Sequence, residues 1–193
     1  MTLTKKLLLA SSSPRRQEIL SQFKIPFSLI PNLIVNEPPI STTSNILTQM
    51  RRLAKLKAES SAVNHSEWIL AADTIVIFKQ SIFGKPSSIN HAISMLTTLS
   101  GNTHRVISSF CLYHPITKKT ITRTHSNLIT FSSISQNDIL NYCKTATPLD
   151  KAGGYGIQDI PDTFIANIRG CYYSVMGLPI KFLLPIIKEY DIV

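Results

Sequence analysis

The sequence has few cysteines and no long hydrophobic run, and each shortage excludes a class of protein. Cys111, Cys143 and Cys171 are an odd number of thiols, and no two of them have a CxxC spacing. This excludes a disulfide framework and a zinc site built on cysteine pairs, and it favours reduced thiols in a cytoplasmic protein. No apolar stretch approaches the ~20 residues that cross a bilayer. The apolar run near the N-terminus is too short for a signal peptide, so we expect no membrane partner.

Acidic residues are also scarce. The 193 residues include 11 Asp and Glu against 20 Lys and Arg, which gives a net charge of +9. Such an excess favours an anionic partner, whether a nucleotide, a nucleic acid or a membrane surface. The basic residues occur in scattered pairs, and no recognisable RNA- or DNA-binding module is present, so we expect no stable nucleic-acid partner. The length fits one domain over residues 1–193, without a separable linker.

The first informative stretch joins an apolar run to a polar turn. Residues 7–10 are apolar, and residues 11–16 are three serines, a proline and two arginines. The pattern predicts a buried strand, a tight turn and a helix with Ser13 as N-cap and Pro14 in its first turn. A helix N-terminus binds anions, and a bound triphosphate would explain two arginines at this position. The alternative is a surface turn with solvated arginines.

A carboxylate interrupts the most apolar segment of the chain. Residues 68–78 are almost entirely apolar, which predicts a central strand buried on both sides, yet Asp73 stands in the middle. A buried carboxylate is costly unless it is paired, bound to a metal or catalytic. A structural salt bridge to a lysine or arginine is the alternative. The small side chains of Ala71 and Ala72 would leave space for a ligand.

Hydrophobic periodicity and turn residues predict the remaining elements. Further strands are expected at residues 27–35, 106–113 and 120–131, helices at 44–62, 88–99, 135–144 and from 179 onward, and a hairpin at 164–176. Pro31 should bend the strand at 27–35 or place it at a sheet edge.

Two loops contain candidate ligand-binding residues. Lys85 stands between a glycine and a proline, in a constrained loop that can direct its ammonium toward a phosphate; a solvated loop lysine is the alternative. Asp150 and Lys151 open a glycine-rich segment, residues 150–158, whose glycines allow positive φ and close approach of the backbone to a ligand. The two charges can hold a metal-bound phosphate or brace the loop. Gln158 offers both a donor and an acceptor, as base recognition requires.

Six of these stretches, taken together, resemble the Maf family of nucleotide pyrophosphatases. They occur in the family's order and cover nearly the whole chain: LASSSPRR at 9–16, ADT at 72–74, GKP at 84–86, LSG at 99–101, LDKAGGYGIQ at 149–158 and MGLP at 176–179. The resemblance implies an α/β fold with a long mixed twisted sheet flanked by helices, and two lobes with a central cleft. It also implies a fold similar to that of the inosine triphosphate pyrophosphatases, and often a homodimer.

The resemblance also implies an activity. The family hydrolyses nucleoside triphosphates to the monophosphate and pyrophosphate with Mg²⁺ or Mn²⁺. Asp73 matches its proposed general base. Arg15, Thr74 and Gln158 look like the specificity residues of the subgroup that prefers dTTP and UTP, whose bases share their edges with modified pyrimidines. The triphosphate would contact the phosphate-binding candidates, which are Ser11, Ser13, Arg16, Lys57 and Lys85.

One position departs from the family pattern. The family usually has an acidic pair after the second strand, whereas this chain has Asn36-Glu37. A gapless reading puts Asn36 in place of the functional glutamate, and a shift of one residue supplies Glu37, which would join Asp73 as a metal ligand. A lost acidic position would fit the alternative function, a non-catalytic nucleotide-binding regulator of cell division. A nucleic-acid binder, motivated by the +9 charge, is a further alternative.

Overall fold

The computed structural model describes residues 7–193, and its main feature is a seven-stranded mixed sheet in the order β2-β1-β3-β5-β6-β7, with β4 also paired to β3. The strands are β1 (Leu7–Ala10), β2 (Phe27–Ile30), β3 (Ile69–Phe78), β4 (Ser81–Phe83), β5 (Thr103–Tyr113), β6 (Thr120–Phe131) and β7 (Ile165–Arg169). Strand β1 runs parallel to β2 and β3, and the other pairs are antiparallel. The expected α/β fold with a long mixed sheet is confirmed.

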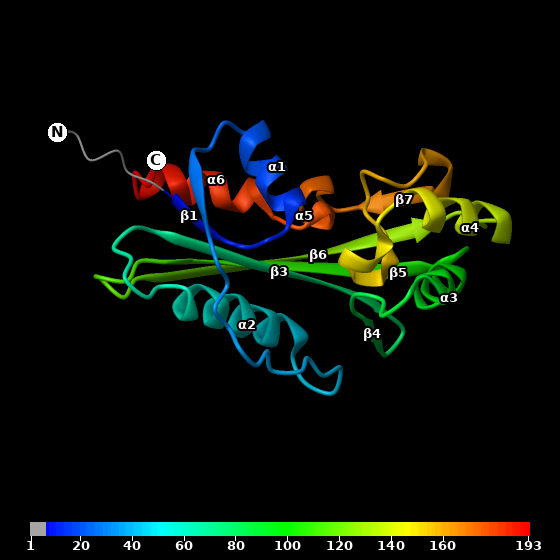
Figure 1. The fold of residues 1–193 in the computed structure, drawn as a ribbon, viewed down its shortest axis with the longest axis horizontal. Helices are drawn as coiled ribbons and strands as arrows, with labels where there is room; N and C mark the ends of the chain where they lie inside the picture. Colours follow the sequence, from blue (N-terminus) through cyan, green and yellow to red (C-terminus); the bar gives the residue numbers. More distant parts are fainter. Residues whose placement is uncertain (1–6) are drawn as a thin grey trace.

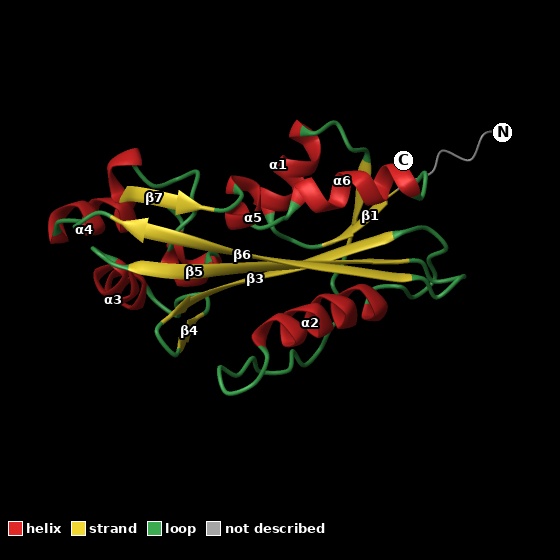
Figure 2. Ribbon diagram, turned by 180° about the vertical axis from the view of Figure 1, so that it is seen from behind, coloured by secondary structure: helices red, strands yellow, loops and turns green. Residues whose placement is uncertain are grey.

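Helices cover both faces of this sheet (Figures 1 and 2). They are α1 (Pro14–Gln22), α2 (Ile46–Ser60), α3 (Ile89–Leu99), α4 (Gln136–Thr145), α5 (Tyr172–Met176) and α6 (Ile180–Glu189). Helix α2 lies against one face of the long strands, and α1, α5 and α6 lie across the other (Figure 1). None of the helices within residues 7–193 combines the length and apolar character needed to cross a bilayer.

Local signals explain where several helices begin. Asn45, Ser88 and Ser135 are the N-caps of α2, α3 and α4, and each side chain accepts a hydrogen bond from a backbone N–H in the first turn. Ser13 is the N-cap of α1, as expected, but its side chain makes no such bond. The first N–H groups of α1 are therefore left without this side-chain partner.

Alternation along β3 sends neighbouring residues to opposite faces of the sheet. Leu70, Ala72 and Val76 belong to the larger core, which includes residues of α1, α3, α4 and α6. The odd-numbered residues of β3 pack in two smaller clusters that include residues of α2. Asp73 therefore faces α2, and Thr74 faces the larger core.

The sheet has a gap along one edge of β3. Strand β1 pairs with β3 only at Ile69 and Leu70, and β4 pairs with it only at residues 76–78. Residues 71–75 have no strand partner on this edge, although β5 pairs with them on the other. At this open edge a ligand can contact side chains on both faces of β3. Asp73 and Thr74, which point to opposite faces, can therefore belong to one site.

The structure corrects two sequence-based expectations. The strand predicted at residues 27–35 ends at Ile30, because Pro31 has no N–H to continue the ladder; β2 does lie at the sheet edge. Cys171–Met176 was expected to be the second strand of a hairpin, but Tyr172–Met176 is helix α5. The backbone N–H of Cys171 donates to Asn127 Oδ1 at 2.9 Å, so it is not available to a strand ladder.

Candidate active site

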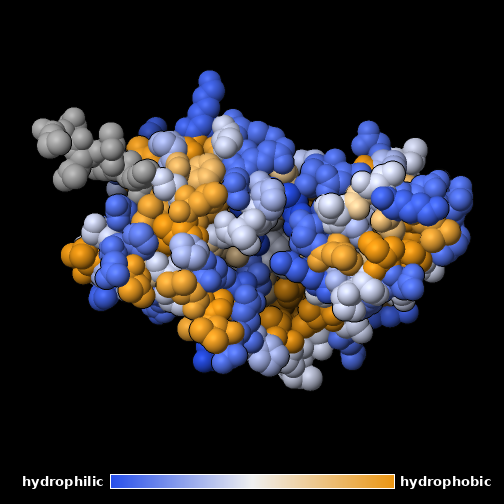
Figure 3. Space-filling view, viewed as in Figure 1, coloured by the Kyte–Doolittle hydropathy of each residue, from blue (hydrophilic) through white to orange (hydrophobic). Residues whose placement is uncertain are grey.

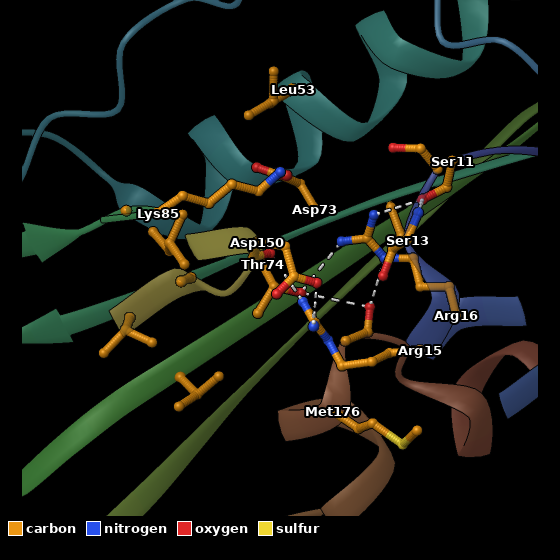
Figure 4. A pocket seen from close by; sticks show the side chains of 18 of the residues that line it. Ser11, Ser13, Arg15, Arg16, Leu53, Asp73, Thr74, Lys85, Asp150 and Met176 are labelled. Carbon is orange, nitrogen blue, oxygen red and sulfur yellow. Dashed lines mark hydrogen bonds and ion pairs between the residues drawn. The ribbon is translucent and has the colours of Figure 1, made fainter. Parts of the chain in front are cut away.

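A cavity of about 610 Å³ opens at the gap beside β3. A hydrophilic hollow marks the middle of this face of the molecule (Figure 3), and side chains from several elements converge on the cavity (Figure 4). All but one of the residues predicted to act on a substrate line it, namely Ser11, Ser13, Arg15, Arg16, Glu37, Lys57, Asp73, Thr74 and Lys85; the exception is Gln158. The gap, the turn before α1 and the end of α2 bring them together.

One wall of the cavity holds a lysine between two carboxylates. Lys57, in the last turn of α2, is 6% exposed, and its Nζ lies 2.9 Å from Asp73 Oδ1 and 2.9 Å from Glu37 Oε1. Of the two positions that the sequence left open for an acidic group, Glu37 lines the cavity and Asn36 does not. The salt bridge proposed as a structural alternative for Asp73 does exist, but it lies in the wall of the cavity.

Glu37 and Asp73 fit a divalent cation that binds together with a ligand. Magnesium is commonly held by one or two carboxylates plus phosphate oxygens and water, all of them hard donors. Within residues 7–193 no group of three or more His, Cys, Asp or Glu side chains could hold a metal ion. The protein therefore offers part of a coordination shell, and a phosphate would have to supply the rest.

Arg16 has a different environment on the other face of β3. Its Nη1 donates to Ser11 Oγ at 2.9 Å, its Nε to the carbonyl oxygen of Gly177 at 3.1 Å and its Nη2 to Thr74 Oγ1 at 3.5 Å. All three acceptors are neutral, and no carboxylate of the described residues forms an ion pair with Arg16. Burial lowers the pKa of its guanidinium, against the opposing effect of Asp73. A desolvated cation of this kind favours an anionic ligand.

Arg15 is held by the glycine-rich loop. Its Nη1 lies 3.2 Å from Asp150 Oδ2, and its Nη2 donates to the Asp150 carbonyl oxygen at 3.3 Å. Lys151 Nζ bonds Asp150 Oδ1 at 2.9 Å and the Thr147 carbonyl oxygen at 2.6 Å. Burial alone would raise the pKa of Asp150, but Lys151 and Arg15 hold it below its usual value. Lys151 braces the loop, and Gly153 and Gly154 provide the positive φ expected there.

Lys85 and Ser13 complete the polar lining. Lys85 is exposed, lies in the wall of the cavity and makes no ion pair with any described residue, so its charge is available to a ligand. The backbone N–H of Ser13 donates to Ser11 Oγ at 3.3 Å, which holds the turn before α1. Ser11 Oγ therefore serves both Ser13 and Arg16.

Gln158 is the one predicted residue that the structure places elsewhere. It lines a neighbouring hollow of about 460 Å³, which shares Arg15 and Asp150 with the main cavity. The Arg15–Asp150 pair lies at the boundary between the two spaces. Within the described residues, Gln158 Oε1 is buried without a hydrogen-bond partner.

Sequence reasoning missed two groups that support the site. The carbonyl of Gly177 bonds Arg16, and Ser108 Oγ lies 2.8 Å from Thr74 Oγ1. Gly177 belongs to a recognised motif, but backbone acceptors leave no mark in a sequence. Ser108 and Ser109 interrupt the apolar run of β5 as Asp73 interrupts β3, and that signal could have found Ser108.

A family model described as Maf-like protein matches residues 6–190. A Bacillus cereus protein named dTTP/UTP pyrophosphatase is 41% identical over 97% of this chain and 97% of its own length. Proteins of the same name from Clostridium perfringens and Chlamydia caviae are 38% and 41% identical over 97% of this chain, and the matches cover 98% and 95% of their lengths.

Solved structures show a weaker likeness. A nucleoside-triphosphatase / dITP/XTP pyrophosphatase from Mycobacterium abscessus gives a TM-score of 0.46 at 12% identity, covering 95% of this chain and 94% of its own. The Staphylococcus aureus Ham1 protein gives 0.43 at 15% identity, covering 66% and 72%. At these scores the likeness carries no weight for the site.

Proposed function

The chain belongs to the Maf family, and from this premise we propose that it is a nucleoside triphosphate pyrophosphatase that hydrolyses dTTP and UTP to the monophosphate and pyrophosphate. Three relatives of nearly equal length bear the name dTTP/UTP pyrophosphatase. The observation that carries the proposal is one cavity that holds two carboxylates around Lys57 and also Arg16, a cation that forms no ion pair with any residue of 7–193. Modified pyrimidine triphosphates present the same edges and are included.

The phosphates would bind where positive charge is uncompensated. Arg16 offers a desolvated guanidinium, and Lys85 offers an ammonium without an ion-pair partner among the described residues. The start of α1, where the Ser13 side chain makes no cap, adds backbone N–H groups. Ser11 and Ser13 complete this surface, and the two cations stabilise the charge that develops on the leaving pyrophosphate.

Asp73 would act as the general base. Its carboxylate takes a proton from a water molecule, the water oxygen attacks the α-phosphorus, and pyrophosphate leaves with the electrons of the broken P–O bond. Lys57 orients this carboxylate through Oδ1. Glu37 and Asp73 would hold Mg²⁺ or Mn²⁺, which when bound neutralises phosphate charge and makes phosphorus more electrophilic.

Base recognition would use Arg15, Thr74 and Gln158. Thr74 lines the main cavity, whereas Gln158 lines the neighbouring hollow, and Arg15 lines both. A pyrimidine that contacts all three must therefore lie at the boundary between the two spaces. Gln158, whose amide has donors as well as an acceptor, would donate from its NH₂ group to a carbonyl oxygen of the base there.

The competing function, a non-catalytic nucleotide-binding regulator of cell division, needs the cations but not Asp73. Its main support was the departure at Asn36. Glu37 lines the cavity 2.9 Å from Lys57, and a carboxylate available there supports the enzyme over the regulator.

The test is pyrophosphate release from dTTP, UTP, CTP, GTP and 7-methyl-GTP with Mg²⁺ or Mn²⁺, for the wild type and Asp73→Asn. We expect turnover of dTTP and UTP, and a fall in kcat of about 10²–10⁴-fold in the variant, with nucleotide binding retained. Nucleotide binding without turnover in the wild type would favour the regulator. Near-full kcat in the variant would remove Asp73 as the base.

A further inference from the structure

A buried serine lies directly beneath Thr74. Ser108, in β5, is the residue opposite Thr74 in the strand register and is fully buried. Its Oγ lies 2.6 Å from the carbonyl oxygen of Ser174, in α5, and 2.8 Å from Thr74 Oγ1. Three elements thus meet at one hydroxyl group.

Counting protons fixes the direction of these hydrogen bonds. A carbonyl oxygen only accepts, so Ser108 donates its single proton to Ser174. Ser108 must then accept at its other contact, and Thr74 is the donor there. The other acceptor in reach of the Thr74 proton is the Gly177 carbonyl, at 3.5 Å, which also lies in the protein. One lone pair of Thr74 Oγ1 accepts from Arg16 Nη2 at 3.5 Å, so toward the cavity Thr74 offers its other lone pair and no proton.

Asn127 holds α5 in place, and with it the Ser174 carbonyl that accepts from Ser108. Asn127 Nδ2 donates to Ser174 Oγ at 3.0 Å and to the Val106 carbonyl at 3.1 Å, while its Oδ1 accepts from Cys171 N–H. A backbone carbonyl and a backbone N–H thereby fix which end of the amide is which. Ser174 is fully buried, so water does not compete for these bonds. The bond directions are set by backbone groups that do not titrate.

We propose that Ser108 is a positioning residue for base selection, holding Thr74 as a hydrogen-bond acceptor so that the site takes pyrimidines with an N–H at N3. Uracil and thymine carry that N–H, whereas cytosine has a lone pair at N3, which would face the lone pair of Thr74. This inference rests on the proposed function, in which Thr74 contacts the pyrimidine. One lost or repulsive hydrogen bond corresponds to about a tenfold preference or more for UTP over CTP.

The experiment compares kcat/KM for UTP and CTP in the wild type and Ser108→Ala. The substitution removes the nearer acceptor of the Thr74 proton and leaves only the 3.5 Å contact with the Gly177 carbonyl, so Thr74 can turn and donate to cytosine N3 instead. We expect the CTP:UTP ratio of kcat/KM to rise about tenfold. Thr74→Val, which has no hydroxyl, should lower UTP turnover without a gain for CTP.

Ser109→Ala is the matched control. Ser109 is the next residue of β5, is equally buried and faces the other side of the sheet. Its Oγ likewise donates to a backbone carbonyl, that of Arg123 at 3.0 Å, and contacts a threonine, Thr124 Oγ1, at 2.9 Å. Loss of this hydroxyl perturbs the strand similarly but leaves Thr74 untouched, so the CTP:UTP ratio should stay within twofold of the wild type.

The outcomes separate this inference from the proposed function. If the wild type hydrolyses UTP and the ratio is unchanged in Ser108→Ala, the inference is wrong and the function stands. If the wild type hydrolyses no triphosphate, the proposed function fails, and titration calorimetry with UMP and CMP decides the inference. At least tenfold tighter binding of UMP by the wild type supports it; equal affinities, or no binding, overturn it. That measurement also decides the matter if Ser108→Ala does not fold.

Discussion

Lys57 and Arg16 lie at opposite faces of β3, and their surroundings differ in the charge of their partners. Lys57 Nζ has two carboxylates at 2.9 Å, whereas the guanidinium of Arg16 has a hydroxyl at 2.9 Å, a carbonyl at 3.1 Å and a second hydroxyl at 3.5 Å. The charge of Lys57 is compensated within the protein. That of Arg16 is solvated by neutral dipoles and remains available to a ligand.

The difference assigns separate tasks to the two cations. A compensated lysine between Glu37 and Asp73 organises the carboxylates and contributes to the stability of the free protein. An uncompensated arginine costs desolvation energy in the free protein, and an anionic ligand recovers it on binding. Substitution of Arg16 should therefore change ligand binding more than stability, and substitution of Lys57 should do the reverse.

The largest expected effect is on binding. Arg16→Met removes the uncompensated charge, so the affinity for a non-hydrolysable α,β-imido analogue of UTP should fall about 100-fold, because charge-assisted bonds to phosphate are worth roughly 1.5–3 kcal/mol. The free energy of unfolding of the free protein should stay within about 1 kcal/mol of the wild type. Calorimetric titration and urea denaturation measure the two quantities.

Arg52→Met is the control for this variant. Arg52 is an exposed arginine of α2 that forms no ion pair with the described residues, so the same change of charge there should leave the affinity within about twofold. An Arg16→Met protein that bound the analogue as tightly as the wild type would end the assignment of Arg16 to the phosphates.

A histidine on the Arg16 face extends the comparison to pH. His104 is 2% exposed, its Nε2 lies 2.6 Å from Tyr155 Oη, and burial lowers its pKa to about 4. The unfolded chain takes up this proton below pH ~6.5 but the folded chain only near pH 4, so stability falls as pH drops through that window. Between pH 6.5 and 5 the loss should be about 2 kcal/mol.

Paired denaturation curves isolate this contribution. The wild type should lose about 2 kcal/mol more than His104→Gln between pH 6.5 and 5. His91→Gln, at an exposed histidine of α3, should follow the wild type. Equal pH dependence in the wild type and His104→Gln would show that His104 is not held neutral. The Arg16 face of the sheet would then tolerate a second positive charge besides that of Arg16.

The parts of the fold and the site that could be predicted from the sequence are those that depend on neighbouring residues. The turn before α1, the helices that begin near residues 88 and 135, and Asp73 within an apolar strand each carry their signal in a few neighbouring residues. The strand predicted at the end of the hairpin was wrong, since residues 172–176 form α5, and the side chain that takes the Cys171 N–H, Asn127, is 44 residues away. Lys57 was predicted to contact phosphate, but its ion pairs with Glu37 and Asp73 were not foreseen. The role of Ser108 was hidden, since Ser108 meets Ser174 across 66 residues and a buried serine stands out less than a buried carboxylate.

Lys57→Met tests the other side of the comparison. Removing the cation leaves two carboxylates facing each other, so unfolding should become easier by about 1–2 kcal/mol, less than for a fully buried pair because the Glu37 side chain is 49% exposed. Lys55→Met, which removes the exposed i,i+4 pair with Glu59 on the same helix, should cost at most about 0.5 kcal/mol. Equal losses in the two variants would mean that the charges around Lys57 are not coupled.

The smallest expected effect concerns the start of α1, next to Arg16. Ser135 Oγ accepts from Asp138 N–H at 3.1 Å and donates to its carboxylate at 2.6 Å, so Ser135→Ala should destabilise the protein by about 1 kcal/mol. Ser13 makes no cap bond, so Ser13→Ala should change the free energy of unfolding by only about 0.3 kcal/mol. A loss near 1 kcal/mol in Ser13→Ala would show that the serine caps α1 in solution, and the amides assigned to the phosphates would then have a partner already.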